Sequence, residues 1–289
     1  MLALPAFAAS DKPTYLALGD SIPFGMNPLL LPPYSAVPPL PRPNQFVGYP
    51  EIVAAASQLS PSQLLNAACP GETSGSFLNI GSLDLGCNSP HPQPSPLPPI
   101  PPFKPTIGLK APYQNAQIEF AEAQLSANKQ INLVTLSIGA NDVLLVVGQC
   151  AGDPNPASCI DAGLKTTLPV YAGNLAQILT RIRAKYKGSL IMVKYYSPVT
   201  ELNPVTSALN DTMIQVAAQL ATQRGFAPVH FAEGYLAFQF ASALFNHDAC
   251  QAGLLIRLPP PSPQPCDVHP SPLGRNVLAA AVQLARLQR

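Results

Sequence analysis

The sequence predicts an α/β protein in which a parallel sheet of five strands is covered by helices on both faces. Short apolar runs alternate along the chain with longer segments of helical spacing. This alternation is typical of strand–helix–strand units, whose strands run parallel and whose helices pack on the sheet. The expected strands are residues 14–18, 63–67, 131–138, 189–195 and 227–231.

The expected helices lie between these strands and after the last one. Pro50 and Glu51 favour the start of a helix, because proline suits the first helical position and an acidic residue suits the first turn. Residues 114–128 and 202–224 carry helical spacing, and the last helix is expected over residues 272–289.

The chain is expected to form one domain over residues 11–289. Its 289 residues allow one large domain or two small ones, and motifs at both ends favour the first. Its 36 prolines gather near residues 28–43, 90–105 and 259–272, where they favour stiff surface loops without backbone donors. Residues 92–102 also have the composition of a polyproline ligand for an aromatic groove, so a recognition role stays open for that loop.

Charged residues are scarce and balanced. They make up 11% of the chain, against a usual share of about 25%, and the net charge is +1. Because no basic face is available to neutralise phosphates, nucleic acid and anionic membrane surfaces are not expected as partners. No apolar stretch reaches the length of about 18 residues that a transmembrane helix needs, so stable membrane insertion is not expected.

The six cysteines are expected to form disulfides, because none of them has the C-x-x-C spacing of a zinc or redox site. Six cysteines allow about fifteen pairings. Pairing in sequence order is favoured because it closes three short loops, which join Cys69 to Cys87, Cys150 to Cys159 and Cys250 to Cys266.

Residues 1–10 resemble the end of a secretory signal, or else form a disordered start. Ala6 and Ala8 make the small-residue pattern of a signal cleavage site, although the basic region that opens such signals is missing. Together with the disulfides, this segment predicts an oxidising location, either secreted or periplasmic.

A candidate nucleophile follows the first expected strand. The apolar run of residues 15–18 ends in Gly19-Asp20-Ser21, where the chain leaves the sheet and turns toward a helix. Open α/β sheets place active sites at this edge. A serine hydroxyl is a poor nucleophile at neutral pH, so it needs an imidazole to take its proton and a carboxylate to orient the imidazole.

Asp267 and His269 have the spacing of such a base and its orienting acid. In an extended segment, residues two apart point to the same side of the backbone. His247 has an acid beside it at Asp248, but adjacent side chains point in different directions. The other histidines are weaker candidates, since one lies in an expected strand and one in a proline-rich stretch: His230 and His91.

Four separated segments resemble, in order, the sequence blocks of the GDSL, or SGNH, hydrolase family. They are Gly19-Asp20-Ser21, Asn66-Ala67-Ala68-Cys69-Pro70-Gly71, Gly139-Ala140-Asn141-Asp142 and Asp267-Val268-His269. The first block alone has ordinary turn composition, whereas the ordered set is specific. Ile22 follows the first block where the family usually has leucine. The chain has no Gly-x-Ser-x-Gly motif, which disfavours an α/β-hydrolase elbow.

The resemblance implies a three-layer α/β/α sandwich with a central, mostly five-stranded parallel sheet. It also implies that Ser21 is the nucleophile, that His269 is the general base and that Asp267 orients it. Ser21, Gly71 and Asn141 would form the oxyanion hole, and no metal or cofactor would be needed. Asp142 is interpreted as a helix cap outside the site.

Each site residue also has a structural interpretation. Asp20 and Ser21 suit a helix cap, Gly71 suits a turn, and Asn141 suits a cap. Residues 72–75 have the polarity of an ordinary loop.

The sequence therefore predicts a serine hydrolase of carboxylic esters, an esterase or lipase that forms an acyl-enzyme. Its expected substrate is a small-molecule or lipid-like ester, and it is expected to be a monomer. Five apolar residues suit an acyl pocket and equally suit the core: Ile22, Phe24, Met26, Val143 and Leu144. A carbohydrate O-acetyl esterase, an acyltransferase and a non-catalytic surface-binding module remain alternatives.

Overall fold

The sheet is described by a computed structural model that covers residues 12–31, 40–90, 102–260, 262 and 264–288. Five parallel strands follow one another in the order β2-β1-β3-β4-β5, which confirms the predicted fold. They are β1 (Tyr15–Gly19), β2 (Leu64–Asn66), β3 (Leu133–Ser137), β4 (Ser189–Val193) and β5 (His230–Ala232). The expected signal remnant, residues 92–101 of the expected polyproline segment and residues 32–39 of another proline-rich stretch lie outside the described residues.

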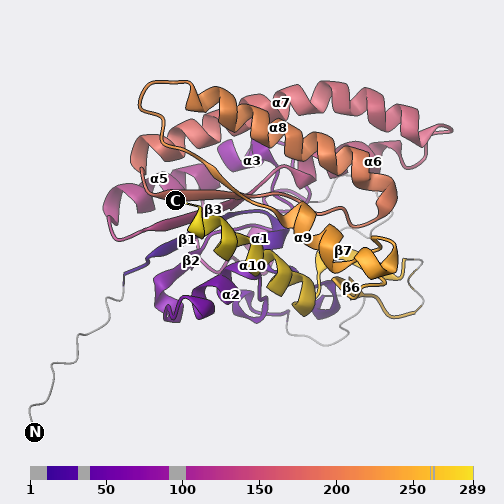
Figure 1. Cartoon of the computed structure of the whole chain (residues 1–289), viewed down its shortest axis with the longest axis horizontal. Coiled ribbons are helices and arrows are strands. Elements are labelled where there is room, and N and C mark those ends of the chain that lie inside the picture. The colour runs from indigo at the N-terminus through magenta and orange to yellow at the C-terminus, as the bar shows by residue number, and fades with distance from the viewer. Residues whose placement is uncertain (1–11, 32–39, 91–101, 261, 263, 289) are drawn as a thin grey trace, which may run out of the picture.

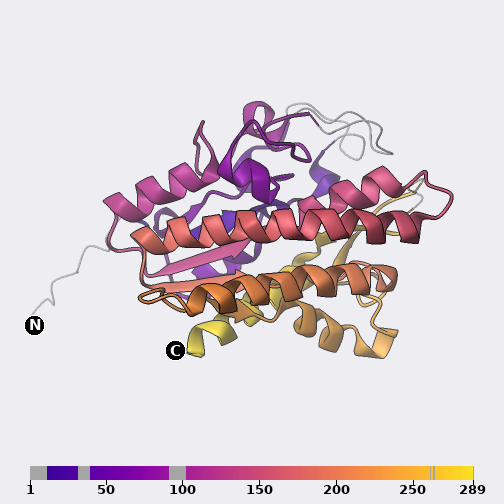
Figure 2. The ribbon, with the colours of Figure 1, turned by 90° about the horizontal axis from the view of Figure 1, so that it is seen from above.

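Helices cover both faces of this sheet, as Figure 1 and Figure 2 show. On one face lie α2 (Tyr49–Ala56), α9 (Gly234–Ala241) and α10 (Pro272–Leu287). On the other face lie α3 (Ser74–Leu78), α5 (Gln117–Ala127), α6 (Ala140–Cys150), α7 (Pro156–Lys185) and α8 (Asn203–Ala221). The protein is therefore a three-layer α/β/α sandwich.

Smaller elements complete the described fold. Two short helices are α1 (Ser21–Phe24) and α4 (Phe103–Thr106), and a separate antiparallel pair consists of β6 (Leu255–Arg257) and β7 (Cys266–Pro270). Five 3₁₀ helices cover Pro28–Leu30, Pro43–Gln45, Pro61–Gln63, Thr200–Leu202 and Ala243–Phe245.

Two adjacent inner strands, β1 and β3, are buried throughout because helices cover both of their faces. Every residue of β1 and β3 is buried, which is the pattern of a parallel sheet in the middle of a sandwich. Their polar groups find partners inside: the hydroxyls of Tyr15 and Thr135 lie 2.9 Å apart, and those of Tyr49 and Ser137 lie 3.0 Å apart.

The helix α2 begins where proline and acid predict a helix start. Pro50 occupies the first turn, and Glu51 accepts a hydrogen bond of 2.7 Å from the backbone N–H of Gly48. This contact satisfies a donor that the helix itself leaves unpaired.

The longest helix, α7, lies between two expected strands, where the sequence predicts a helix without giving its bounds. It runs through 30 residues and contains Pro169 in its interior, together with threonines and glycines that disfavour helix. Asn155 caps its start by accepting a hydrogen bond from Ser158 N. Packing against α5, α6 and α8 stabilises it against this low propensity.

The six cysteines form three disulfides in sequence order, which confirms the predicted pairing: Cys69–Cys87, Cys150–Cys159 and Cys250–Cys266. The first bond braces the loop after β2, the second joins the end of α6 to α7, and the third joins β7 to the segment after α9. In the described part of the chain, none of the helices is both long and apolar enough to cross a membrane.

Candidate active site

The loop after β1 has the predicted strand–turn–helix form. Gly19 has φ of +130°, and a Cβ atom there would come within 1.9 Å of the carbonyl oxygen of Ser137, so the tight exit from the sheet requires glycine. Asp20 caps α1 by accepting a hydrogen bond of 3.0 Å from Ile22 N. Ser21 is the first residue of α1 and is half-buried at the carboxyl edge of the sheet.

The carboxyl group of Asp20 is fully buried and carries a partner that the sequence analysis missed. The hydroxyl of Tyr195, which follows β4, donates a hydrogen bond to Asp20 Oδ2. Burial raises the pKa of Asp20 to about 7, while the hydrogen bonds from Tyr195 and Ile22 and the nearby charge of His269 limit the rise. His269 therefore acts electrostatically on the neighbour of Ser21.

Asp267 and His269 lie in contact on β7, the extended segment that their spacing predicted. Asp267 Oδ1 is hydrogen-bonded to the ring atom Nδ1 of His269 and also accepts a bond of 3.0 Å from the backbone N–H of His269. Burial alone raises the pKa of Asp267, but the charge and hydrogen bonds of His269 outweigh it and bring the pKa below its usual value. The His269 side chain is 15% exposed, so it is shielded but still open to a substrate.

Two contacts fix the strand that carries this pair. The hydroxyl of Tyr196 donates a hydrogen bond of 2.6 Å to the main-chain oxygen of Val268, and its ring is stacked on Phe238 with centroids 4.0 Å apart. The Cys250–Cys266 disulfide anchors the start of β7. Thus held, β7 packs against α1, the helix that begins with Ser21. Among the described residues, no hydrogen bond joins Ser21 Oγ to the ring of His269.

Gly71 and Asn141 come from distant segments and meet at Glu72. Gly71 has φ of +85°, and a Cβ atom there would lie 2.3 Å from the carbonyl oxygen of Leu85, so the turn accepts only glycine. Asn141, buried in the first turn of α6, donates a hydrogen bond of 2.8 Å from Nδ2 to the main-chain oxygen of Glu72. One N–H of this amide is thereby used.

Asp142 caps a helix other than its own. Its carboxylate accepts hydrogen bonds of 2.8 Å from Ser74 N and 2.5 Å from Ser74 Oγ, at the first residue of α3. Asn174 of α7 also donates to Ser74 Oγ, at 3.0 Å. The cap interpretation of Asp142 thus holds in a different form, because the contact docks α6 on α3.

Residues 72–74, which have the polarity of an ordinary loop, are instead buried. Glu72 Oε2 accepts a hydrogen bond from Gln117 Nε2, and Gln117 also binds both backbone groups of Gly19. Buried polar groups need such partners, because each unmade hydrogen bond is costly away from water. The sequence carried no local signal for this network, since its members are far apart in the chain.

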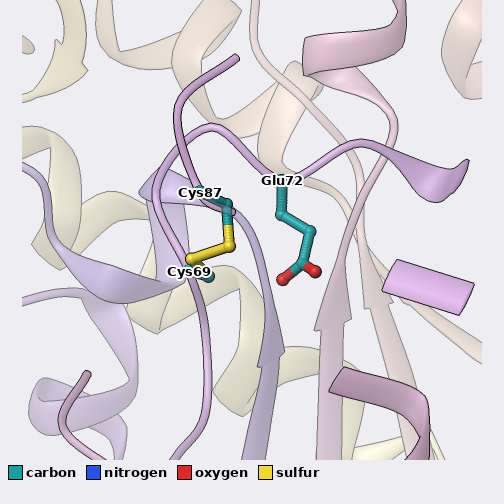
Figure 3. A group of neighbouring side chains, drawn as sticks. All are labelled: Cys69, Glu72 and Cys87. Atoms are coloured by element: carbon teal, nitrogen blue, oxygen red, sulfur yellow. A yellow bond between two sulfur atoms is a disulfide. The ribbon is translucent and has the colours of Figure 1, made fainter. Parts of the chain in front are cut away.

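Cys69, Glu72 and Cys87 form a cluster of atoms that metal ions often bind, drawn in Figure 3. The two sulfur atoms are joined in a disulfide, so neither offers a thiolate. A single carboxylate remains, which does not make a metal site.

The competing histidine His230 lies at the other end of the sheet from Ser21. His230 belongs to β5 and lines an open cavity of about 700 Å³ at the amino ends of β3 and β4, the sheet edge opposite Ser21. The ring of His247 contacts the main-chain oxygen of Gln239 at 3.1 Å. His91 lies outside the described residues.

The apolar residues near Ser21 divide between core and surface. Phe24 is fully buried and packs against Phe46 and Phe103 with ring centroids 5.1 Å away in each case, so it belongs to the core. Ile22 and Val143 are also buried, whereas Met26 and Leu144 are partly exposed.

Comparison with known proteins agrees with this architecture. The model of the GDSL-like Lipase/Acylhydrolase family matches residues 17–277, whereas no curated protein matches the chain. Among solved structures, the chain is similar to phospholipase A1 from Streptomyces albidoflavus NA297, with a TM-score of 0.52 and 18% identity over 94% of this chain and 98% of that chain. It is also similar to the lipase Lip_vut3 from a goat rumen metagenome, with a TM-score of 0.50 and 13% identity over 95% and 97% of the two chains.

At these identities the two structures establish the fold, and the family match carries the assignment further. The matched residues run from β1 into α10 and enclose every candidate site residue. The chain therefore belongs to the GDSL-like lipase/acylhydrolase family, whose activity is ester hydrolysis.

Proposed function

We propose that the protein is an exported serine hydrolase of carboxylic esters, with Ser21 as nucleophile, His269 as general base and Asp267 as the acid that orients the base. The observation that carries the proposal is the Asp267–His269 pair on β7, packed against the helix that begins at Ser21. The bond from Nδ1 to Asp267 leaves the other ring nitrogen, Nε2, to take a proton.

In the first half of the reaction, Ser21 Oγ bonds to the ester carbonyl carbon as its proton passes to His269 Nε2. The carbonyl electron pair moves to oxygen, which becomes an oxyanion. When the carbonyl re-forms, the bond to the alcohol oxygen breaks and the alcohol takes the proton from His269. Water then attacks the acyl-enzyme: its oxygen bonds to the acyl carbon as one of its protons passes to His269. The bond from the acyl carbon to Ser21 Oγ breaks, the acid is released, and His269 returns the proton to Ser21 Oγ.

The proposed oxyanion hole consists of the backbone N–H groups of Ser21 and Gly71 and the side-chain amide of Asn141. The amide of Asn141 has two N–H groups, and only one is used in the bond to Glu72 O. Donors of this kind contribute about 3 kcal/mol each when they are preorganised. The bond to Glu72 provides that preorganisation, because it holds the amide before substrate arrives.

Esters of lipid-like acids are the substrates that we expect. Met26 and Leu144 are partly exposed apolar residues close in sequence to Ser21 and Asn141, and the similar structures are a phospholipase A1 and a lipase. A series of p-nitrophenyl esters of increasing acyl length tests this expectation against acetylated xylan. Preference for xylan acetate identifies a carbohydrate O-acetyl esterase instead, and a new ester formed with an added alcohol identifies an acyltransferase.

Export to an oxidising compartment and a monomeric state complete the proposal. Three disulfides with no free cysteine suit a secreted or periplasmic protein. Light scattering coupled to size exclusion measures the mass in solution, for which we expect the value of one chain, 30.4 kDa.

The deciding experiment is the replacement Ser21→Ala, with Ser62→Ala as the control because Ser62 is an exposed serine outside the site. We expect Ser21→Ala to lose p-nitrophenyl ester turnover and labelling by a fluorophosphonate probe, while Ser62→Ala keeps both. Turnover at the wild-type rate in Ser21→Ala contradicts the proposal. A folded wild-type protein that neither reacts with the probe nor hydrolyses esters identifies a non-catalytic binding module.

A further inference from the structure

Glu72 is a buried carboxylic acid that the proposed reaction does not use. Its side chain is fully buried, and Oε1 has no hydrogen-bond partner among the described residues. Figure 3 shows the carboxyl group beside the Cys69–Cys87 disulfide, which offers no charge to pair with it. A buried carboxyl group of this kind costs folding free energy, so we expect its contacts to give it a role.

One amide connects the Glu72 side chain to the nucleophile strand. Gln117 Nε2 donates to Glu72 Oε2 and, at 2.9 Å, to the carbonyl oxygen of Gly19. Gln117 Oε1 accepts a bond of 2.6 Å from Gly19 N. Gly19 lies two residues before Ser21, so the position of the nucleophile is tied to the position of Glu72.

The main chain of Glu72 makes the remaining connections. Its carbonyl oxygen accepts the hydrogen bond of 2.8 Å from Asn141 Nδ2, and its peptide bond joins it to Gly71. All three proposed donors of the oxyanion hole are thus linked to this one residue. The link to Gly71 is covalent, the link to Asn141 is direct, and the link to Ser21 passes through Gln117 and Gly19.

We propose that Glu72 is the positioning residue of the oxyanion hole, which it holds together as a neutral acid through Gln117 and through its own carbonyl oxygen. The inference rests on the proposed function, since it assigns no reaction of its own. Positioning matters here because donors stabilise the oxyanion only when they are fixed before charge develops.

Protonation of Glu72 follows from its surroundings. Burial raises its pKa to about 8, against the opposing effect of Lys104 and the hydrogen bond from Gln117. Two nearby carboxyl groups, Asp84 and Asp20, raise it further. Among the described residues, the phenol of Tyr113 also interacts with Glu72, and burial is the chief cause that raises the pKa of this phenol.

Ionisation of Glu72 therefore places a negative charge next to Gly71, where the substrate oxygen also has to become negative. Lys104, on α4, offsets part of this negative charge. Its ammonium group donates hydrogen bonds of 3.1 Å to Asn88 Oδ1 and 2.7 Å to the carbonyl oxygen of Asn115. We expect the oxyanion to lose stabilisation as pH rises through the pKa of Glu72, so that turnover declines on the alkaline side.

The test measures kcat and KM for a soluble p-nitrophenyl ester from about pH 6 to pH 10 in the wild type and in Glu72→Gln. Glutamine keeps the volume and the acceptor for Gln117 but cannot ionise. We expect wild-type kcat to fall about tenfold on the alkaline side and the Glu72→Gln profile to stay flat there, with KM unchanged. Glu119→Gln is the matched control, because it removes an exposed carboxylate from α5, the helix that carries Gln117.

A second variant, Glu72→Leu, removes the bond to Gln117 as well as the charge. We expect its kcat to be about tenfold below the value that the wild type has at the acid end of this range and to stay flat toward alkaline pH, with KM within about twofold of the wild type. An alkaline decline in Glu72→Gln equal to that of the wild type overturns the inference, and so does wild-type kcat in Glu72→Leu. If Glu72→Leu does not fold by circular dichroism, the profile of Glu72→Gln decides alone.

Failure of the underlying function has a different signature. Full turnover in Ser21→Ala overturns the proposed triad and the positioning role together. An inactive Ser21→Ala combined with an unchanged pH profile in Glu72→Gln overturns only the role of Glu72.

Discussion

Tyr196 donates a hydrogen bond of 2.6 Å to the main-chain oxygen of Val268, between Asp267 and His269. A residue that follows the central sheet thereby holds the separate strand that carries the proposed base. We expect Tyr196→Phe to lose about 1 kcal/mol of unfolding free energy, because one partly buried hydrogen bond is removed while the ring stays stacked on Phe238.

Turnover in Tyr196→Phe should fall several-fold with little change in KM, since the base is displaced and binding is not. Chemical denaturation and ester kinetics measure the two effects. Tyr235→Phe makes the same chemical change on α9 and should leave both quantities as in the wild type. Equal effects of the two substitutions argue against a specific role for the Tyr196 bond.

Asp267 and His269 should differ in their importance for turnover. Removing the base in His269→Ala should abolish measurable ester hydrolysis, whereas Asp267→Ala should leave a slow reaction by a misoriented imidazole. Single-turnover kinetics with a p-nitrophenyl ester compare them. A loss in Asp267→Ala as large as that in His269→Ala contradicts this division of roles.

The buried carboxyl group of Asp20 predicts a pH dependence of stability. Burial raises its pKa from the ordinary value of 3.8 to about 7 in the folded protein. Between pH 3.8 and about pH 7, the folded state binds more protons at this group than the unfolded state does. The contribution of Asp20 to stability therefore falls as pH rises toward 7 and stays constant above it. Asp20→Asn removes the effect.

The melting temperature of Asp20→Asn relative to the wild type should therefore increase from about pH 4 to pH 7 and level off above. Thermal denaturation at a series of pH values measures this difference. A difference that is constant over the whole range contradicts the raised pKa.

Gly71 should not tolerate a side chain. In Gly71→Ala the new Cβ atom meets the carbonyl oxygen of Leu85 at 2.3 Å, and φ of +85° is unfavourable for alanine. We expect a loss of about 1–3 kcal/mol in stability and a fall in kcat, because the turn that carries a proposed oxyanion donor has to move. Gly152→Ala is the control, since a Cβ atom there meets nothing within 4 Å, and its kcat and melting temperature should be unchanged.

The disulfides should separate stability from activity. Replacing Cys250 and Cys266 by serine removes a crosslink at the start of β7, and replacing Cys150 and Cys159 removes one between α6 and α7. Loss of either disulfide should lower the unfolding free energy by about 3 kcal/mol in the chain-entropy model. Only the first pair should also lower kcat, because only it anchors the strand of His269. Equal kcat in both double variants, measured below their melting temperatures, contradicts that view.

The sheet could be predicted because strands that are covered on both faces are apolar along their whole length. Every residue is buried in two of these strands, Tyr15–Gly19 and Leu133–Ser137. Such strands can be recognised from local composition, without knowing which segments they pack against. A helix between the third and fourth strands could also be predicted, but the 30-residue length of α7 could not. Pro169 and several weak helix formers interrupt its helical pattern, and packing against neighbouring helices stabilises it.

The site shows the same division between local and distant information. Asp267 and His269 are two residues apart, so the period of a strand is enough to predict their contact. Tyr195 binds Asp20 across 175 positions, and Gln117 binds Gly19 across 98. No local pattern reports such pairs, and they emerge only from the folded chain.

The proposed nucleophile and the proposed base belong to different sheets, because Ser21 follows β1 of the five-stranded sheet while His269 lies on the β6–β7 hairpin. The distance between nucleophile and base therefore depends on how this pair of strands is attached to the main sheet. Two attachments described above, the Tyr196 hydroxyl and the Cys250–Cys266 crosslink, are thus the positions at which protein engineering would adjust the approach of the imidazole to the serine.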